Sequence, residues 1–386
     1  MLRPHLIAAL VAFAPTLSAA QSRPEQGAFV VRLGTDTVAV ERYTRTATRL
    51  ESDVAVRVPR TRIIRYTATL SPDGSMSRLD VKVRPMDTGP GALPPAQGAL
   101  VFGADSARVT LTMGDSTQTV AAAVRPGAMA VTGFAYAFYE QLALRARRMG
   151  GDSVTIQIVP FGSNQAFDAY VARRGPDAVD IDYFGSPYHV RTDKAGRMLA
   201  LDGRETTNKV QVERVARVDV EAAARAFAAD DAGGRVLGQL SPRDTVRATV
   251  GAAHLAVDYG RPHKRGREIF GSVVPWGQVW RTGANAATGF TTDADLVVGG
   301  TTIPKGSYTL WTLPRPDGAK LIVNRQTGQW GTEYDPKQDL VRLDLTSEAV
   351  SDPVEVFTIG IDPRGDGGVL TLAWDRTRYA LPFTVR

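Results

Sequence analysis

The chain contains no cysteine, and this absence excludes several classes of function at once. None of the 386 residues is a cysteine, so disulfides, thiolate nucleophiles and cysteine-ligated metals are ruled out. Histidine is scarce too, and only His189, His254 and His263 lie beyond residue 20. None of them belongs to an HxH or HExxH motif, and His254 and Asp258, on one face of a predicted strand, are about 13 Å apart. The sequence therefore predicts no metal and no cofactor.

Long apolar runs are missing from the body of the chain. An apolar stretch at residues 6–13 follows Arg3, and it is too short to cross a bilayer. Ser18-Ala19-Ala20 then fits the small-x-small rule of a signal-peptide cleavage site. We expect residues 1–20 to be a signal peptide cleaved near Ala20. The mature protein, without a transmembrane segment, is expected to be periplasmic or extracellular.

A concentrated charge of one sign is also missing. The net charge is +6, and basic and acidic residues are nearly balanced in both halves of the chain. Nucleic-acid binding needs a concentrated positive field, so nucleic acid is not expected as a partner. No P-loop, dinucleotide fingerprint or G-x-S-x-G elbow is present, which removes the usual signatures of nucleotide binding and serine hydrolysis.

The sequence contains a strong β pattern. The length of the chain suggests two domains. In residues 21–235, short alternating segments separated by turn residues predict a curved antiparallel sheet. One long helix is expected at residues 129–149, because Phe134, Phe138 and Leu142 recur at helical spacing and should face inward. A short helix is expected at residues 220–229, after Asp219 as its N-cap.

The C-terminal part of the chain has a different organisation. Residues 236–246 predict a linker, because Gly, Pro and Asp are frequent there and no periodicity is visible. Residues 247–386 contain eight predicted short strands with turns between them. This pattern is typical of an antiparallel β-sandwich or a jelly roll. The fold class is therefore mainly β.

A glycine-framed polar block distinguishes this C-terminal part. The block reads YGRPHKRGREIFGSVVPWGQVWRTGAN, from Tyr259 to Asn285, and contains five glycines among arginines and tryptophans. Glycine lets the backbone turn or approach another group closely. Arginine offers forked donors for carboxylate or phosphate, and tryptophan offers a flat stacking surface. The block predicts a shaped polar surface rather than core filling.

The same motifs carry a family resemblance. They include YGRP, GREIFG and VPWGQVWRTGAN, followed in order by IPKGSYTLWTLP and GQWGTEYD. From about Ala248 to Val385 the chain resembles the DUF2911 family of bacterial proteins. The resemblance implies an exported β-domain and no established activity. In that family an acidic residue usually follows the GAN triplet, whereas residues 286–288 here are Ala-Ala-Thr, so that acid has no counterpart.

The candidate ligand-binding residues share arginine, amide or aromatic chemistry and lie in the block or in a later glycine loop. They are Arg261, Arg267, Trp280, Arg281, Asn285, Trp330 and Tyr334. A small polar molecule, an anion, a saccharide or an envelope protein is the expected partner. The alternative is that the arginines pair with Asp335, Asp339 and Glu355 to hold loops, while the aromatic rings anchor the core.

The leading hypothesis is an exported, non-enzymatic binding or structural protein of the bacterial cell envelope. Two alternatives remain open. Glu333, Asp335 and Asp339 are candidate acid/base residues of a hydrolase acting on envelope glycans or esters. The N-terminal domain becomes a carrier of lipid or another hydrophobic ligand if an apolar cavity lies under its helix, although a core filled by side chains is favoured.

Overall fold

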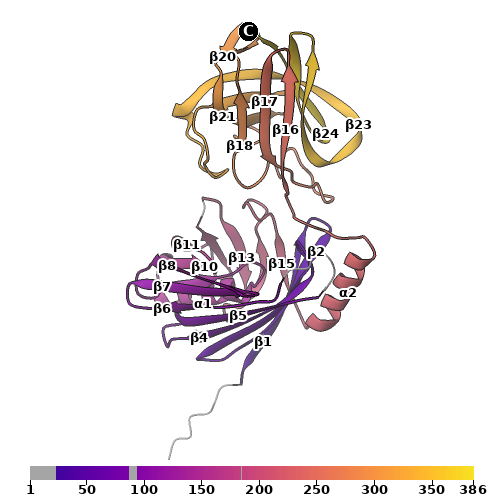
Figure 1. The fold of residues 1–386 in the computed structure, drawn as a ribbon. Helices are drawn as coiled ribbons and strands as arrows, with labels where there is room; N and C mark the ends of the chain where they lie inside the picture. The colour runs from indigo at the N-terminus through magenta and orange to yellow at the C-terminus, as the bar shows by residue number, and fades with distance from the viewer. Residues whose placement is uncertain (1–22, 87–93, 184) are drawn as a thin grey trace, which may run out of the picture.

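A computed structural model describes residues 23–86, 94–183 and 185–386. The expected signal peptide lies outside these residues. The described chain is mainly β, with one large sheet on each side of a short connection (Figure 1). We refer to β1 through α2 as the N-terminal unit and to β16 through β24 as the C-terminal unit. None of the described helices is both long and apolar enough to cross a bilayer.

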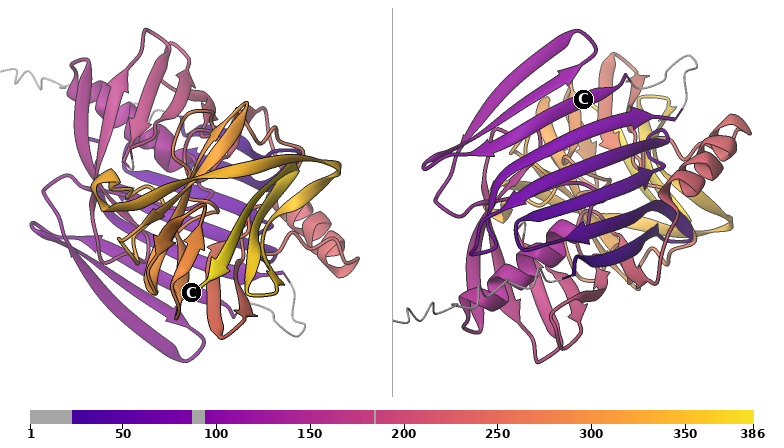
Figure 2. Two further views of the ribbon diagram at one scale, coloured as in Figure 1. Left: turned by 90° about the horizontal axis from the view of Figure 1, so that it is seen from above. Right: turned by 90° about the horizontal axis from the view of Figure 1, so that it is seen from below.

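The N-terminal unit is built on one curved sheet of fifteen strands (Figure 2). Its strand order is β8-β7-β6-β5-β4-β3-β2-β1-β15-β14-β13-β12-β11-β10-β9. Neighbouring strands are antiparallel, apart from the parallel pair β9 and β10. The strands are β1 (Glu25–Leu33), β2 (Asp36–Arg45), β3 (Arg49–Val56), β4 (Arg62–Leu70), β5 (Met76–Pro85), β6 (Ala96–Phe102), β7 (Ser106–Met113), β8 (Ser116–Ala123), β9 (Met129–Val131), β10 (Ser153–Pro160), β11 (Phe167–Arg173), β12 (Ala178–Asp182), β13 (Tyr188–Thr192), β14 (Met198–Asp202) and β15 (Gln211–Val215).

Helix α1 (Ala137–Met149) packs on one face of this sheet, with Phe138 and Leu142 fully buried as expected. The predicted extent of the helix, residues 129–149, is wrong at its start. Met129–Val131 forms β9 instead and pairs with Ile158–Pro160 of β10. Phe134 lies before the helix with a left-handed backbone (φ 67°), which interrupts the helical path.

The start of α1 is set by a contact that is remote in sequence. Glu41 of β2 is fully buried, and its carboxylate accepts hydrogen bonds from the backbone N–H groups of Tyr136 (2.5 Å) and Ala137 (3.2 Å). No side chain within the helix segment caps it. A carboxylate at a helix N-terminus satisfies free N–H groups and suits the helix dipole. Local sequence alone therefore does not define this boundary.

Helix α2 (Val220–Ala232) covers the opposite face of the same sheet. Val220 and Ala224 pack against Val40, Ala55 and Ile63 of β2, β3 and β4. As expected, the helix begins after Asp219, whose side chain accepts a hydrogen bond from the backbone N–H of Ala222 (2.9 Å).

The connection to the C-terminal unit is short. The predicted linker, residues 236–246, overlaps the first strand of that unit, because β16 (Arg243–Val250) pairs along its whole length with β17. The non-repetitive segment between α2 and β16 is therefore residues 233–242.

The C-terminal unit is a nine-stranded antiparallel arrangement with the order β16-β17-β18-β21-β22-β23-β24-β19-β20. The elements are β16, β17 (Ala253–Gly260), β18 (Thr288–Thr292), β19 (Leu296–Val298), β20 (Thr301–Ile303), β21 (Gly306–Arg315), β22 (Gly318–Asn324), the short 3₁₀-helix η1 (Pro336–Gln338), β23 (Asp339–Arg364) and β24 (Gly367–Val385). The long strand β23 pairs with β22 through its first residues and with β24 through the rest. It thereby joins two ladders whose apolar faces enclose one core, as in a sandwich.

The two units touch through a turn of the polar block. The backbone N–H of Thr35, between β1 and β2, donates to the carbonyl oxygen of Arg265 (3.1 Å), and the buried Arg265 guanidinium forms an ion pair with Asp36 (2.7 Å). A Cβ atom on Gly34 would lie 2.0 Å from the Arg265 carbonyl oxygen, so only glycine fits there. This contact brings one end of the N-terminal sheet next to the polar block.

Candidate functional site

The structure brings three of the predicted ligand-binding residues together around Gly331. The backbone N–H of Gly331 donates to the carbonyl oxygen of Asn285 (3.0 Å), and Ala286 forms an isolated β-bridge with Trp330. A Cβ atom on Gly331 would lie 2.0 Å from Cδ of Arg281. The Arg281 side chain therefore runs directly over the Gly331 backbone, and Arg281, Asn285 and Trp330 form one surface, which we call the Arg281 surface.

The loop that carries this surface has an uncommon backbone conformation. Thr282 (φ 53°) and Asn285 (φ 65°) both lie in the left-handed region, which is costly for a β-branched residue such as threonine. The loop is held by a close approach of the Gly260 and Ala284 backbones, since a Cβ atom on Gly260 would lie 2.2 Å from the carbonyl oxygen of Ala284. The YGRP and TGAN motifs are therefore two halves of one backbone contact.

Trp330 is the exposed aromatic side chain of this surface. It has 44% of its surface exposed, and it follows Gly328, whose φ of 79° forms the turn. Its backbone N–H donates to Oε2 of Glu333 (3.0 Å), which fixes the loop. The loop backbone is thus fixed and the Trp330 side chain is largely accessible to solvent, and stacking on a sugar or another flat ligand requires such an accessible ring.

Arg281 has no protein partner among the described residues. It forms neither an ion pair nor a side-chain hydrogen bond there, and its Nε atom is buried without an acceptor. Loss of hydration lowers the pKa of Arg281 to about 10, so the guanidinium remains charged at neutral pH. A buried donor without an acceptor is destabilising. The Nη atoms of Arg281 are not among the buried unpartnered atoms, so an anionic or polar ligand would meet the guanidinium there.

The other two predicted arginines differ in their partners. Arg261 forms an ion pair with Asp244 (3.1 Å) and donates to the Thr358 hydroxyl (3.2 Å). Arg267 has no ion pair among the described residues and donates only to the backbone oxygens of His263 and Lys264. Burial, followed by the charge of Arg265, lowers the pKa of Arg267 to about 10. Arg261 is therefore held structurally, whereas Arg267 keeps an unbalanced charge.

Two of the predicted aromatic residues have packing roles. Trp280 packs between Phe357 and Trp374, with ring centroids 5.0 Å and 5.8 Å away. Tyr334 packs on Trp311, with ring centroids 5.0 Å apart. These contacts match the core-anchor alternative for both rings, and they leave Trp330 as the aromatic candidate of the Arg281 surface.

The three candidate acid/base carboxylates each hold a loop. Glu333 accepts the N–H of Trp330, and Asp335 accepts the N–H of Lys337 (2.9 Å) at the start of η1. Asp339 accepts from the Tyr334 hydroxyl (2.7 Å), and it forms an ion pair with Arg342 (2.8 Å). Burial, followed by the hydrogen bond to Asp339, raises the pKa of Tyr334 to about 12.

The acids expected to neutralise the block arginines also have other partners. Asp339 pairs with Arg342, and Glu355 accepts the backbone N–H of Arg265 (2.8 Å). Away from the block, His254 pairs with Asp293 (2.8 Å), while Asp258 pairs with Arg243.

Sequence reasoning missed one residue that belongs next to this surface. Lys209 precedes β15 in the N-terminal unit and is partly buried. Burial, and then the charges of Arg281 and Arg267, lower the pKa of Lys209 to about 8. Nothing in the local sequence indicates this position, because the neighbouring charges come from the other unit.

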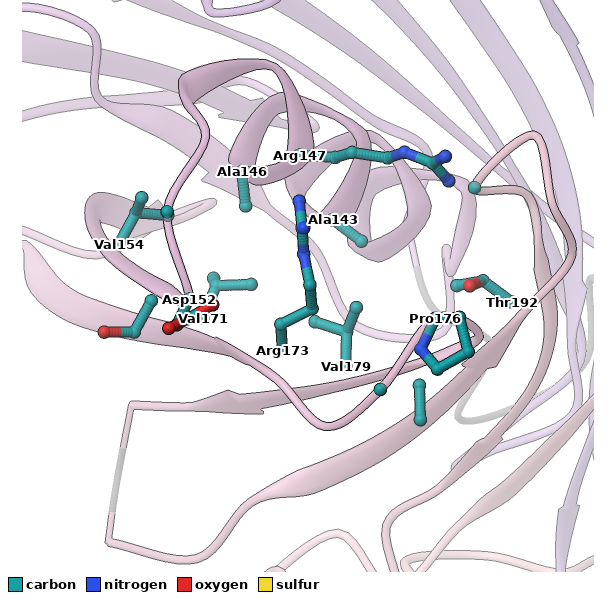
Figure 3. A pocket seen from close by; sticks show the side chains of 15 residues that line it. Ala143, Ala146, Arg147, Asp152, Val154, Val171, Arg173, Pro176, Val179 and Thr192 are labelled. Carbon is teal, nitrogen blue, oxygen red and sulfur yellow. The ribbon is translucent and has the colours of Figure 1, made fainter.

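A separate cavity lies in the N-terminal unit, between the end of α1 and strands β10 to β12 (Figure 3). Its volume is about 240 Å³, and Val154, Val171 and Val179 form part of its wall. Arg173 extends toward α1, and Arg147 extends from α1 on the same side (Figure 3). The carboxylate of Asp152 lines the same cavity, so the two cations exceed the acidic groups by one. An apolar wall with this net positive charge suits a small amphiphilic anion.

The same unit contains a buried ionic cluster that holds α1 to the sheet. Glu140 of α1 is fully buried and forms ion pairs with Arg45 and Arg214. The Tyr43 hydroxyl (2.5 Å) and the backbone N–H of Met198 (2.6 Å) also donate to it. Every acceptor position of this carboxylate is therefore engaged, and the cluster has a structural role.

Comparison with known proteins finds a family model that matches one part of the chain. The model of DUF2911, described as a protein of unknown function, matches residues 241–383. No match is found among curated proteins. A DUF1089 family protein from Pseudomonas aeruginosa is 11% identical with a TM-score of 0.32, and the match covers 50% of this chain and 95% of that one. A β-barrel-like protein of the domain of unknown function DUF1849 from Brucella abortus is 11% identical with a TM-score of 0.30, covering 50% and 94%. Both scores are too low to support a functional argument. The C-terminal resemblance to DUF2911 is thus confirmed.

Proposed function

We propose that this protein is an exported, non-enzymatic binding protein of the bacterial cell envelope. Its Arg281 surface takes a polar ligand that carries an acceptor group, such as an anion or an acidic saccharide. The observation that carries the proposal is the Arg281 guanidinium, which is charged, partly buried and without a protein acceptor among the described residues. Asn285 and Trp330 lie beside it and are exposed.

Simple side-chain chemistry supports this ligand class. A guanidinium donates in a fixed fork that matches carboxylate, sulfate or phosphate oxygens. An indole ring stacks on the apolar face of a sugar, and an amide accepts or donates to a hydroxyl. The three groups together favour a ligand with one charged oxygen group and one flat face.

The test uses the mature full-length chain and a panel of neutral and acidic glycan fragments, with affinity measured by calorimetry. Arg281→Gln and Trp330→Ala are expected to weaken binding at least tenfold with little change in melting temperature. Arg315→Gln and Trp276→Ala are matched controls, since both residues are exposed outside the surface. Loss of folding in Arg281→Gln would support a structural role for the block, and equal effects of variants and controls would refute the proposal.

A second candidate function rests on the cavity beside α1. Its apolar wall and the arginines Arg147 and Arg173 suit a small fatty-acid-like ligand. Val179→Phe, which fills the cavity, and Arg173→Gln, which removes one cation, are expected to reduce binding of a short fluorescent fatty acid. Unchanged binding in both variants would reject this site.

A further inference from the structure

Lys209 lies where the two units meet. Its backbone is left-handed (φ 54°), and it stands two residues before β15. Gln211 of β15 pairs with Arg32, next to the end of β1. The turn after β1 contains Thr35, which binds the Arg265 carbonyl oxygen of the C-terminal unit. Lys209 therefore emerges at the end of the N-terminal sheet that contacts the polar block.

Three cations from both units gather at this joint. A Cβ atom on Gly34 would lie 3.1 Å from Cγ of Arg267, so the Arg267 side chain lies against the turn after β1, and Lys209 precedes the strand that pairs with the end of β1. The charges of Arg281 and Arg267 both act on Lys209 and lower its pKa. Lys209 and Arg281 have no hydrogen-bond or ion-pair partner among the described residues, and Arg267 binds only backbone oxygens. Glu205 acts on Lys209 with smaller effect than Arg281 and Arg267 do, and Glu355 acts on Arg267 with smaller effect than Arg265 does. Neither glutamate forms an ion pair with the three cations among the described residues. The local positive charge is therefore unbalanced.

Like charges that are partly removed from water repel one another and favour a counter-ion. A single carboxylate carries one negative charge and two oxygens. A phosphate monoester carries about two negative charges at neutral pH and offers three strong acceptor oxygens. Nε and Nη2 of Arg267 already donate to backbone oxygens, so its Nη1, the Arg281 guanidinium and the Lys209 ammonium supply the donors for three phosphate oxygens. Their three positive charges are balanced more closely by a phosphate monoester than by a single carboxylate.

We propose that Lys209, Arg267 and Arg281 form a binding site for a phosphate group between the two units. The inference rests on the proposed function, because Arg281 is shared, and it adds the ligand class and a contact from the N-terminal unit. Free phosphate, a phosphorylated sugar and a phospholipid headgroup share this chemistry. The phosphate group occupies the joint, and the remainder of the ligand extends toward Asn285 and Trp330.

Calorimetry on the mature full-length chain in phosphate-free buffer at pH 7 tests the proposal. The probes are inorganic phosphate, glucose 6-phosphate, acetate, and vesicles of phosphatidylcholine with or without phosphatidic acid. Phosphate or glucose 6-phosphate should bind at least tenfold more tightly than acetate. Preferential binding to phosphatidic-acid vesicles would identify a lipid headgroup as the source of the phosphate.

Lys209→Gln provides the decisive variant. Losing a hydrogen bond to a charged group should weaken phosphate binding by about 10- to 100-fold. Lys194→Gln removes the same charge from an exposed turn and should leave the affinity unchanged. Affinity of the wild-type protein should also fall as the pH rises above 8, because Lys209 loses its proton. A melting curve of each variant shows whether it is folded.

Two results overturn the proposal. One is phosphate binding no tighter than acetate binding. The other is equal affinity of Lys209→Gln, Lys194→Gln and the wild-type protein. If glycan binding still depends on Arg281 and Trp330 in either case, the proposed function stands and only the phosphate site fails. If Arg281→Gln and Trp330→Ala also have no effect on any probe, both proposals fail.

Discussion

Replacing Lys209 by methionine should make the ligand-free protein more stable at pH 7. Methionine keeps most of the aliphatic length and removes the charge. The pKa of Lys209 falls from its ordinary value of 10.5 to about 8, with burial as the largest cause and Arg281 and Arg267 next. The charged form is therefore less favourable in the folded protein than in the unfolded chain.

The magnitude follows from this difference. Each unit of pKa corresponds to 1.36 kcal/mol, so the full shift would correspond to about 3.4 kcal/mol. Lys209 is only partly buried, and solvent screens part of the interaction, so the expected gain is on the order of 1–2 kcal/mol. For domains of this size, such a gain raises the melting temperature by about 2–8 °C.

The pH dependence gives an independent check. Below pH 8, Lys209 is protonated in both states, and the full destabilisation is present. Between pH 8 and 10.5, the unfolded chain binds the proton that the folded protein has lost, so wild-type stability should rise with pH. The difference between Lys209→Met and wild type should shrink over this range. Other titrating groups are present in both proteins and therefore cancel.

Differential scanning fluorimetry at pH 7 and pH 10, in buffer without phosphate, measures both effects. Lys194→Met is the control, because Lys194 lies exposed in a turn and its replacement should change the melting temperature little. A melting temperature of Lys209→Met at or below the wild-type value at pH 7 would refute the reasoning. So would an equal rise in the control.

Three further predictions test single contacts. Gly331→Ala would place a Cβ atom 2.0 Å from Cδ of Arg281 and 2.4 Å from the carbonyl oxygen of Asn285, so it should displace both residues and weaken ligand binding at least tenfold, as measured by calorimetry. Burial raises the pKa of Glu41 to about 7, so between pH 4.5 and 7 the folded protein binds a proton that the unfolded chain has lost, and the stability of the wild-type protein should fall as the pH rises. Glu41→Gln should remove this fall, which melting curves across the range check. Asp219→Ala removes the acceptor for the Ala222 N–H and should cost about 1 kcal/mol in chemical unfolding.

The sequence predicts the fold class because both units follow period-two alternation. Asp219 also predicts the start of α2, since an N-cap acts on its own helix. The start of α1 is not predictable in this way. The apolar spacing around residues 129–149 suits a helix, but β9 forms because Met129–Val131 pairs with β10. Tertiary pairing there outweighs local propensity.

The candidate site, too, is predictable only where local sequence determines the structure. The glycines of the block indicate close backbone contacts, and the structure contains them at Gly260 and Gly331. The partners of individual arginines are not visible in the sequence. Arg261 pairs with Asp244, a residue of the neighbouring strand that no motif marks. Lys209 lies outside the family match and meets the block only through the packing of two units.

The contrast between arginines of one block is the strongest argument against a purely structural role. Arg261 and Arg265 show how this chain neutralises a charge that it uses for packing, since each forms an ion pair with an aspartate. Arg281 has no such partner among the described residues, although it is also partly buried. A side chain kept only for packing would be more stable as an apolar residue of similar size, because an unpaired charge is costly to bury. A ligand that supplies an acceptor would compensate for this cost. The stability of the ligand-free Lys209→Met protein measures the corresponding cost of the neighbouring Lys209 charge.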